Sequence, residues 1–381
     1  MRSVGTYLTT TTSGEPVQAF VPHPLPPANP VLDTASFSTL NHLAELALAR
    51  LSGVAGLVPS VDWLLYSAVR KEALLTSQIE GTQATLADLF DQEAGLTISN
   101  TDDVEEVTNY LRAFRLVQDN LRDAAGLPIS VRLLCDAHRL LLNGVRGNGK
   151  QPGELRRSQN WIGGTRPGNA VFVPPPADKV PDLLADLERF VHTDQLSLPP
   201  LVNIALIHAQ FETIHPFLDG NGRIGRLLIA ALMEHWQLLP EPLLYLSAFL
   251  KQHQSEYYRR LSTIRTEGDW ENWVAFFLEA VAGAASEAEQ NIIALSSLVN
   301  TDRRRLLASP KAGPASYRLF EMLPMMPRFT VDAVRQKLAT SFPTANAAVK
   351  VLEELGMVVE MTGQKKNRNY SYQAYIELLA R

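Results

Sequence analysis

Residues 215–226 read HPFLDGNGRIGR, and this stretch decides how the rest of the chain is interpreted. Asp219, Gly220, Asn221 and Gly222 predict a turn that brings successive backbone N–H groups to one point, with a helix beginning directly after it. Glycine permits the unusual dihedrals and the close backbone approach that such a turn requires. The stretch therefore predicts an anion-binding site at a helix N-terminus.

The charged residues of the same stretch indicate that the anion site also carries out a reaction. Arg223 and Arg226 are three residues apart, so they share a helix face and suit a polyphosphate. Asp219 offers a hard oxygen ligand for Mg²⁺ held jointly with phosphate oxygens. His215 is a general base placed just before the site. A structural turn with a helix cap is the alternative, but a base, a metal ligand, an anion site and two arginines within one short stretch favour function.

Working outward, apolar spacing predicts a mainly α-helical chain. Leu40, Leu43, Ala47 and Leu51 predict the buried face of a first helix. Further helices are expected at about 61–80, 102–125, 129–144, 179–193, 200–214, 222–237, 246–263 and 269–298.

Two segments are expected to be non-helical. Residues 1–35 contain Pro22, Pro24, Pro26, Pro27 and Pro30, which favour an extended, polyproline-like segment. Residues 160–164 and 171–176 flank a Pro-Gly-Asn turn, so they predict a short β-hairpin.

The C-terminal part, residues 315–381, has a different rhythm. Three short helices, a strand at 357–361, a basic turn at 362–368 and a strand at 370–372 predict a winged helix-turn-helix. Residues 311–381 carry net charge +4, although the whole chain carries −5. Thr344, Asn346 and Lys350 are expected on the recognition helix and Lys365, Lys366 and Arg368 on the wing, which suits DNA backbone contacts. A protein-interaction or dimerisation module is the alternative.

Composition limits the location of the protein. One cysteine, Cys135, cannot form an internal disulfide, which fits a reducing compartment. No apolar signal segment follows the start, and no stretch approaches the ~20 apolar residues of a membrane span. We expect a cytoplasmic protein without a membrane anchor.

The 215–226 stretch resembles the signature of the Fic family, and every defined position of that signature matches. The resemblance extends over about 125–290, with matching flanks at His208, Phe211-Glu212 and Leu227-Leu228. It implies a mainly α-helical Fic fold with a short β-hairpin called the flap.

The resemblance also implies a reaction, namely transfer of AMP from ATP to a Ser, Thr or Tyr hydroxyl of a target protein. His215 takes the hydroxyl proton, and Asp219 holds Mg²⁺. Arg226 binds the γ-phosphate, while Gly220, Asn221, Gly222 and Arg223 stabilise the other phosphates. The remaining implied contacts are Tyr257 and Tyr258 near the adenine, and Trp161, Ile162, Gly163 and Gly164 of the flap along the target. Core packing is the alternative for the tyrosines and Trp161.

A second motif lies at residues 76–81, which read TSQIEG. Thr76 and Glu80 are four apart on one helix face, and Gly81 ends that helix. The segment resembles the inhibitory motif of Fic proteins, which implies that Glu80 pairs with Arg226 and blocks the γ-phosphate site. In some relatives this glutamate also supports removal of AMP, so a reverse reaction is a further expectation.

We therefore expect four regions: an N-terminal extension carrying the inhibitory motif at 1–120, a catalytic core at 121–298, a linker at 299–314 and a winged helix at 315–381. The family also implies a homodimer. Two alternatives stay open: transfer of another phosphate-containing group, and a DNA-binding regulator whose core senses nucleotide. Gly220-Asn221-Gly222 favours AMP, and an intact His215 argues against a purely sensing core.

Overall fold

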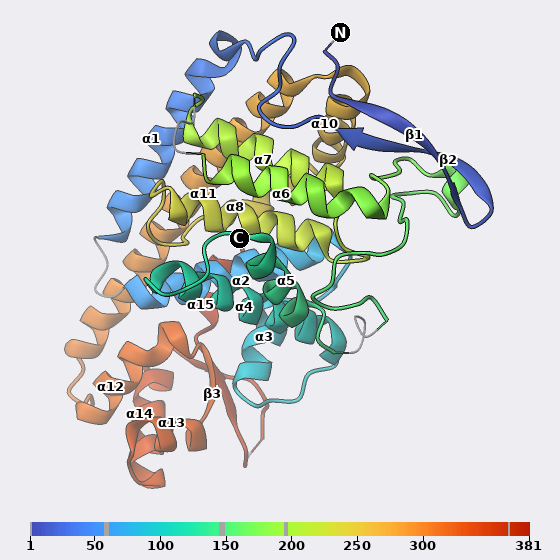
Figure 1. Ribbon diagram of the computed structural model, residues 1–381. Coiled ribbons are helices and arrows are strands. Elements are labelled where there is room, and N and C mark those ends of the chain that lie inside the picture. The colour runs from blue at the N-terminus through green and yellow to red at the C-terminus, as the bar shows by residue number, and fades with distance from the viewer. Residues whose placement is uncertain (1, 57–60, 145–148, 194–196, 365) are drawn as a thin grey trace.

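The computed structural model describes residues 2–56, 61–144, 149–193, 197–364 and 366–381, and this part of the chain is mainly α-helical, as predicted (Figure 1). The α-helices are α1 (Ser38–Ala55), α2 (Val61–Ile79), α3 (Leu86–Glu93), α4 (Thr101–Arg122), α5 (Val131–Leu141), α6 (Val180–Val191), α7 (Pro200–Ile214), α8 (Asn221–His235), α9 (Ser247–Gln252), α10 (Gln254–Glu267), α11 (Trp270–Leu307), α12 (Pro314–Met322), α13 (Val331–Leu338), α14 (Phe342–Glu354) and α15 (Gln373–Ala380). None of the helices in this described part is long and apolar enough to cross a membrane.

Helices α7 and α8 lie at the centre and carry the 215–226 stretch between them. All but the first residue of α7 is buried, because the helix is largely apolar and packs against α6, α8 and α11. Trp273 of α11 donates its indole N–H to the Ala205 carbonyl of α7 at 2.9 Å. The short stretch is therefore held between two helices that the core fixes in place.

The first helix packs differently from its predicted face. Ala44, Ala47, Leu48 and Leu51 are buried against α11, whereas Leu43 is 49% exposed. The prediction for Leu43 was wrong because the 3.6-residue period places it beside the contact face rather than on it.

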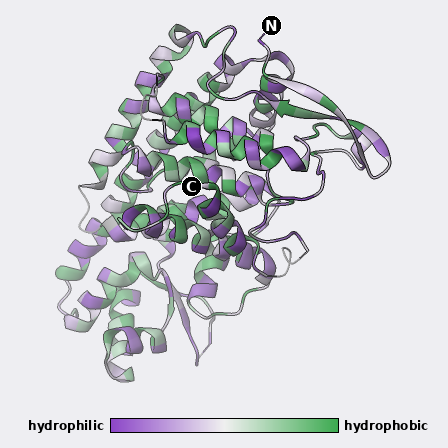
Figure 2. Ribbon diagram, in the orientation of Figure 1, coloured by the Kyte–Doolittle hydropathy of each residue, from purple (hydrophilic) through white to green (hydrophobic). Residues whose placement is uncertain are grey.

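The N-terminal segment is extended, but it forms a β-hairpin rather than an isolated polyproline strand. Strand β1 (Gly5–Thr12) pairs antiparallel with β2 (Glu15–Pro22) around Ser13 and Gly14, which both have positive φ. The β-branched threonines of β1 favour the strand, and apart from Pro16 the prolines begin only at Pro22, the last residue of β2. Figure 1 shows the hairpin extending from the helical body, and Figure 2 shows that its tip is hydrophilic.

The expected flap hairpin at 160–176 is reduced to one β-bridge, between Ile162 and Phe172. Gly163 and Gly164 have φ of 66° and 73°, so the backbone leaves the strand conformation directly after Ile162. Prolines follow Val173 and end the second segment. We keep the name flap for residues 160–173.

The C-terminal region has the predicted order of three helices followed by a β-hairpin. The helices are α12, α13 and α14, and β4 (Val359–Glu360) and β5 (Asn369–Ser371) follow. A further strand, β3 (Arg328–Thr330), was not predicted and pairs with β5. Lys365 lies outside the described residues.

The expected linker at 299–314 is mostly helical, because α11 continues to Leu307. Leu306 and Asp302 are buried, and Asp302 accepts a hydrogen bond from the Tyr372 hydroxyl at 2.9 Å. Tyr375 of α15 contacts the Ser67 hydroxyl of α2 at 2.8 Å. The C-terminal region therefore contacts α2, the helix that leads into the 76–81 segment.

Candidate active site

The loop between α7 and α8 is fixed by its own side chains. His215 ends α7 in the left-handed conformation with φ 49°, and Gly220 precedes α8 with φ 75°. The Asn221 side chain accepts from the Phe217 N–H at 2.8 Å and donates to the Phe217 carbonyl at 2.9 Å. Gly220 has no side chain to cap α8, so the first N–H groups of the helix are available to an anion.

A second contact fixes the loop from α5. His138 accepts the Gly153 N–H at Nδ1 (2.9 Å), so its Nε2 carries the proton and donates to the Asp219 carbonyl at 3.0 Å. Its ring stacks on Phe217 with centroids 3.8 Å apart. Burial lowers the pKa of His138 to about 4, so the ring is neutral at physiological pH.

The surroundings of His215 keep its imidazole neutral. Its Nδ1 is buried, and burial lowers its pKa to about 3, with the Arg265 and Arg156 guanidiniums adding to this effect. The imidazole is therefore neutral at physiological pH and can accept a proton. The buried Arg156 donates Nε to the His215 carbonyl at 2.9 Å and Nη2 to the Pro175 carbonyl at 2.5 Å, which joins this loop to the segment directly after the flap.

Arg226 is paired with Thr76 and Glu80 of the 76–81 segment. Its Nη2 lies 2.5 Å from Glu80 Oε1, and its Nε donates to Thr76 Oγ1 at 2.6 Å. The Arg226 side chain is 2% exposed and that of Glu80 is 34% exposed. Burial opposes ionisation of Glu80, but the Arg226 guanidinium outweighs it and lowers the carboxyl pKa. Gly81 follows with φ 102°, where α2 has ended.

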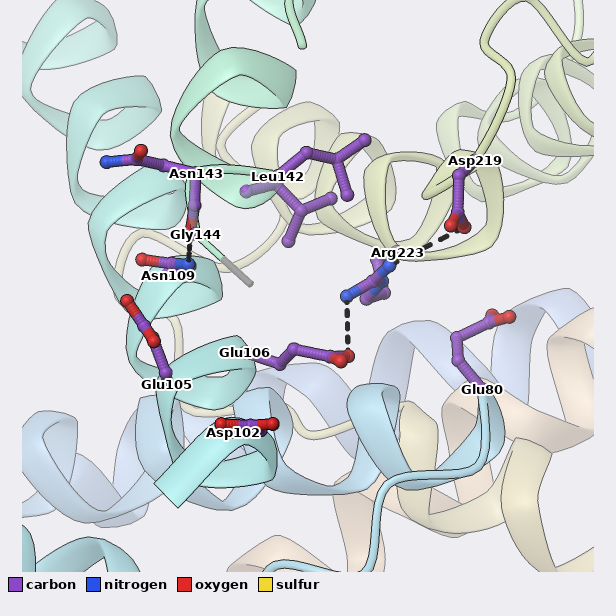
Figure 3. Close-up of a pocket in the computed structure, with 11 residues that line it drawn as sticks. Glu80, Asp102, Glu105, Glu106, Asn109, Leu142, Asn143, Gly144, Asp219 and Arg223 are labelled. Carbon is purple, nitrogen blue, oxygen red and sulfur yellow. Dashed lines mark hydrogen bonds and ion pairs between the residues drawn. The ribbon is translucent and has the colours of Figure 1, made fainter. Parts of the chain in front are cut away.

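Arg223 points into a separate small cavity of about 180 Å³ (Figure 3). Its Nη1 lies 3.1 Å from Glu106 Oε2, and its Nη2 lies 3.8 Å from Asp219 Oδ1. Figure 3 shows Glu80 facing the same space from the end of α2. The two arginines of the stretch are therefore each held by a carboxylate of the N-terminal helices.

A larger cavity of about 820 Å³ contains the base. His215, Gly222 and Arg226 line it together with Glu80, Glu212 and Tyr258. Trp161, Ile162 and Gly163 line it from the flap, whereas Gly164 is not among its lining residues. The structure thus brings together the predicted base, the anion site, the second arginine and the flap.

The two predicted adenine contacts differ. Tyr257 is buried, and its hydroxyl donates to His208 Nε2 at 2.8 Å, since His208 Nδ1 faces the Gly225 carbonyl. Tyr258 is 47% exposed and lines the large cavity. Tyr257 therefore packs in the core behind the cavity, whereas Tyr258 is available to a ligand.

The residues around Asp219 fit a magnesium ion only if a ligand supplies further oxygens. The Asp219 side chain is half-exposed, and no group of three His, Cys, Asp or Glu side chains that could hold a metal occurs in the described part of the chain. Mg²⁺ is commonly bound by one or two carboxylates plus substrate phosphates. The donor set therefore suits a Mg²⁺ ion that arrives with a nucleotide.

Sequence reasoning missed three residues of this site: Glu106, Arg156 and Glu212. Glu106 and Arg156 are far from their partners in sequence, so no spacing reveals the pairs. Glu212 lies three residues before His215, and it was recognised only as a matching flank. Its Oε1 is buried without a hydrogen-bond partner among the described residues, and burial raises its pKa to about 7.

Two regions of the chain match known protein families. Residues 39–119 match the family described as Fic/DOC family N-terminal, and residues 128–233 match the Fic/DOC family. The chain carries both Fic/DOC regions. The 215–226 stretch lies in the second region, and Glu80 and Glu106 lie in the first.

Two relatives are proteins called Protein adenylyltransferase Fic. That of Drosophila erecta is 28% identical over 205 residues, covering 53% of this chain and 38% of the relative. The protein from Drosophila mojavensis is 28% identical over 255 residues, which cover 64% of this chain and 47% of the relative. The matched part thus spans less than half the length of these relatives.

Solved structures show the same fold. A Fic family protein from Desulfovibrio desulfuricans G20 has a TM-score of 0.57 and 24% identity, covering 90% of this chain and 97% of that one. Fic-1 from C. elegans, residues 134–508, has a TM-score of 0.52 and 22% identity, covering 69% and 75%.

Proposed function

We propose that this Fic/DOC chain transfers AMP from ATP to a Ser, Thr or Tyr hydroxyl of a target protein. The observation that carries the proposal is the large cavity, where a neutral imidazole, the start of α8 and a buried arginine face one space. The adenylyltransferase names of the relatives support ATP as the donor.

The residues suggest the following reaction. His215 accepts the proton of the target hydroxyl as its oxygen attacks the α-phosphorus, and the bond from that phosphorus to the pyrophosphate oxygen breaks. The N–H groups at the start of α8 stabilise the charge on the transferred phosphate, and Arg223 and Arg226 bind the leaving pyrophosphate. Mg²⁺ bound at Asp219 with phosphate oxygens supplies additional charge neutralisation.

We further propose that Glu80 restrains the reaction. An arginine that donates to Glu80 and Thr76 has fewer N–H groups left for a γ-phosphate. The carboxylate would also lie against the phosphate, and like charges repel. The same Glu80 carboxylate lines the cavity with His215, so we include AMP removal among its proposed roles.

The donor group is tested with a Glu80→Gly variant and ATP labelled at either the α- or the γ-phosphate. Label from α-labelled ATP alone, with an acceptor mass increase equal to one AMP, is the expected result. Label from γ-labelled ATP would replace the proposal with phosphate transfer. Absence of label from both, with a cell lysate as the acceptor source, would favour the nucleotide-sensing regulator.

A second proposed function concerns residues 315–381, which we interpret as a winged helix that binds DNA. Thr344 and Lys350 of α14 are exposed, as is Lys366 between β4 and β5, and the segment is basic in an acidic chain. Retention of the full chain on duplex DNA that weakens with salt is expected; no retention at low salt would contradict it.

The homodimer and the cytoplasmic location also stay proposals. Light scattering of the purified chain tests the first, and fractionation of the source cells tests the second. The division into 1–120, 121–298 and 315–381 is likewise proposed, with the linker shortened because α11 occupies its first part, from residue 299 to Leu307.

A further inference from the structure

The N-terminal hairpin β1–β2 lies outside both matched Fic/DOC regions, which begin at residue 39. It nevertheless forms part of the wall of the large cavity. Tyr7, Pro16, Val17 and Gln18 of the hairpin line the same space as His215. A segment with no assigned role therefore borders the catalytic base.

The hairpin is joined to the flap rather than resting loosely beside it. The Phe20 N–H donates to the Val173 carbonyl at 3.0 Å, and Arg166 forms an ion pair with Glu15. Val17, Ala19 and Val173 form a small apolar cluster apart from the main core. Figure 1 shows the hairpin beside the loop that contains the flap. Hairpin and flap therefore form one continuous wall.

Exposed apolar side chains of this wall and of α10 gather around the cavity. Tyr7, Trp161, Val171 and Tyr258 are all large, exposed and apolar, and all line the one cavity. Apolar groups exposed around a concave site mark a binding surface. The Tyr7 ring contacts the Phe20 ring with centroids 5.1 Å apart. The Tyr7 side chain is therefore already held in place and loses little conformational freedom when a ligand binds to it.

The hairpin residues also indicate what kind of ligand they contact. Tyr7, Pro16, Val17 and Gln18 carry no charge, so they do not suit a phosphate group. The wall is continuous with the flap, whose Trp161 and Gly163 lie in the same cavity as the base. This surface therefore suits an extended polypeptide whose modified hydroxyl lies at His215 and whose flanking residue has an apolar side chain.

We propose that the hairpin is the outer part of the acceptor-docking groove and that Tyr7 selects acceptors with an apolar side chain near the modified hydroxyl. This inference rests on the proposed AMP transfer and deepens it, because it assigns the substrate class to a named surface. Gln18 lies on the same hairpin face as Tyr7, and its Nε2 donates to Thr9 Oγ1 at 3.0 Å. Gln18 supplies the polar rim of the groove.

The test uses a peptide library with a central Tyr, Ser or Thr and randomised flanking positions. The parent is the full chain with Glu80→Gly, supplied with α-labelled ATP, and the variant adds Tyr7→Ser. Leu8→Ser is the matched control, because Leu8 is the next exposed residue of β1 and points to the other face. Melting temperatures and ATP affinities are measured for all three proteins.

We expect the parent to prefer apolar residues at one flanking position, Tyr7→Ser to weaken this preference roughly fivefold, and Leu8→Ser to keep it. Superimposable profiles for the parent and Tyr7→Ser would overturn the inference while leaving AMP transfer intact. Weaker ATP binding by Tyr7→Ser would instead assign the hairpin to the nucleotide. No labelled peptide from any folded variant would overturn the proposed function, and the inference with it.

Discussion

Arg226 and Glu80 lie 2.5 Å apart, although 146 residues separate them in sequence. Thr76, one turn before Glu80 on α2, accepts from Nε of the same guanidinium at 2.6 Å. The 76–81 segment thus contacts the edge of Arg226 that we propose for the γ-phosphate. The Arg226 side chain is buried, so its charge needs an anionic partner. A phosphate that displaces the Glu80 carboxylate would exchange one anion beside the guanidinium for another.

Thr76→Val is expected to strengthen ATP binding by roughly fivefold, because the loss of one hydrogen bond worth ~1 kcal/mol weakens the hold on Arg226. Isothermal titration with ATP and Mg²⁺ measures the effect. Ser77→Ala is the matched control, since Ser77 is also fully buried on α2 but its hydroxyl has no hydrogen-bond partner among the described residues. Equal affinities for Thr76→Val and the wild type would mean that Thr76 takes no part in restraint.

Glu106→Gln is expected to lower kcat about tenfold in a Glu80→Gly background, with little change in ATP affinity. Glu106 holds one edge of the Arg223 guanidinium, so its loss leaves the arginine poorly oriented toward the leaving pyrophosphate. Glu105→Gln is the control, because Glu105 lines the same small cavity while the ion pairs of Arg223 go to Glu106 and Asp219. A faster rate in Glu106→Gln would instead make Glu106 a second restraint.

Glu212→Gln is expected to change how stability depends on pH. Burial raises the pKa of Glu212 to about 7, so the folded chain holds a proton that the unfolded chain releases above its ordinary pKa of about 4.5. The contribution of this bound proton to the free energy of unfolding is complete below pH 4.5 and is lost as the pH rises through 7. Relative to the Gln variant, the wild type should lose about 3 kcal/mol between pH 4.5 and pH 8.

Urea unfolding of both proteins at the two pH values measures this difference, and other titrating groups cancel between them. If the free energies of unfolding of wild type and Glu212→Gln differ by the same amount at both pH values, the buried carboxyl does not titrate in this range.

The helical fold could be predicted because helix periodicity is a local pattern, whereas the Glu80–Arg226 pair was expected only from the resemblance of the two motifs to the Fic family. Helix periodicity marks α7 and α8, and the positions of Thr76, Glu80 and the two arginines within their motifs are fixed by helix spacing. The bounds of α2 agree with the prediction to within one residue.

The remaining features depend on contacts between distant segments. The Glu106–Arg223 and Arg156–His215 contacts join residues 117 and 59 positions apart, and no periodicity encodes them. The N-terminal hairpin was missed because the five prolines from Pro22 to Pro30 were given more weight than the run of threonines before them. The arginines at 303–305 suggested a linker, but α11 continues through them because Leu306 and Asp302 are buried.

One experiment tests the central claim most directly. Wild type, Glu80→Gly, Glu80→Gln and the double variant Glu80→Gly/His215→Ala are incubated with Mg²⁺, α-labelled ATP and a lysate as acceptor, and intact masses are recorded. Glu80→Gln keeps the size of the side chain but removes its charge. We predict strong AMP labelling with both single variants, weak labelling with wild type and none with the double variant. Equal labelling by wild type and Glu80→Gly, or persistent labelling by the double variant, would contradict the account.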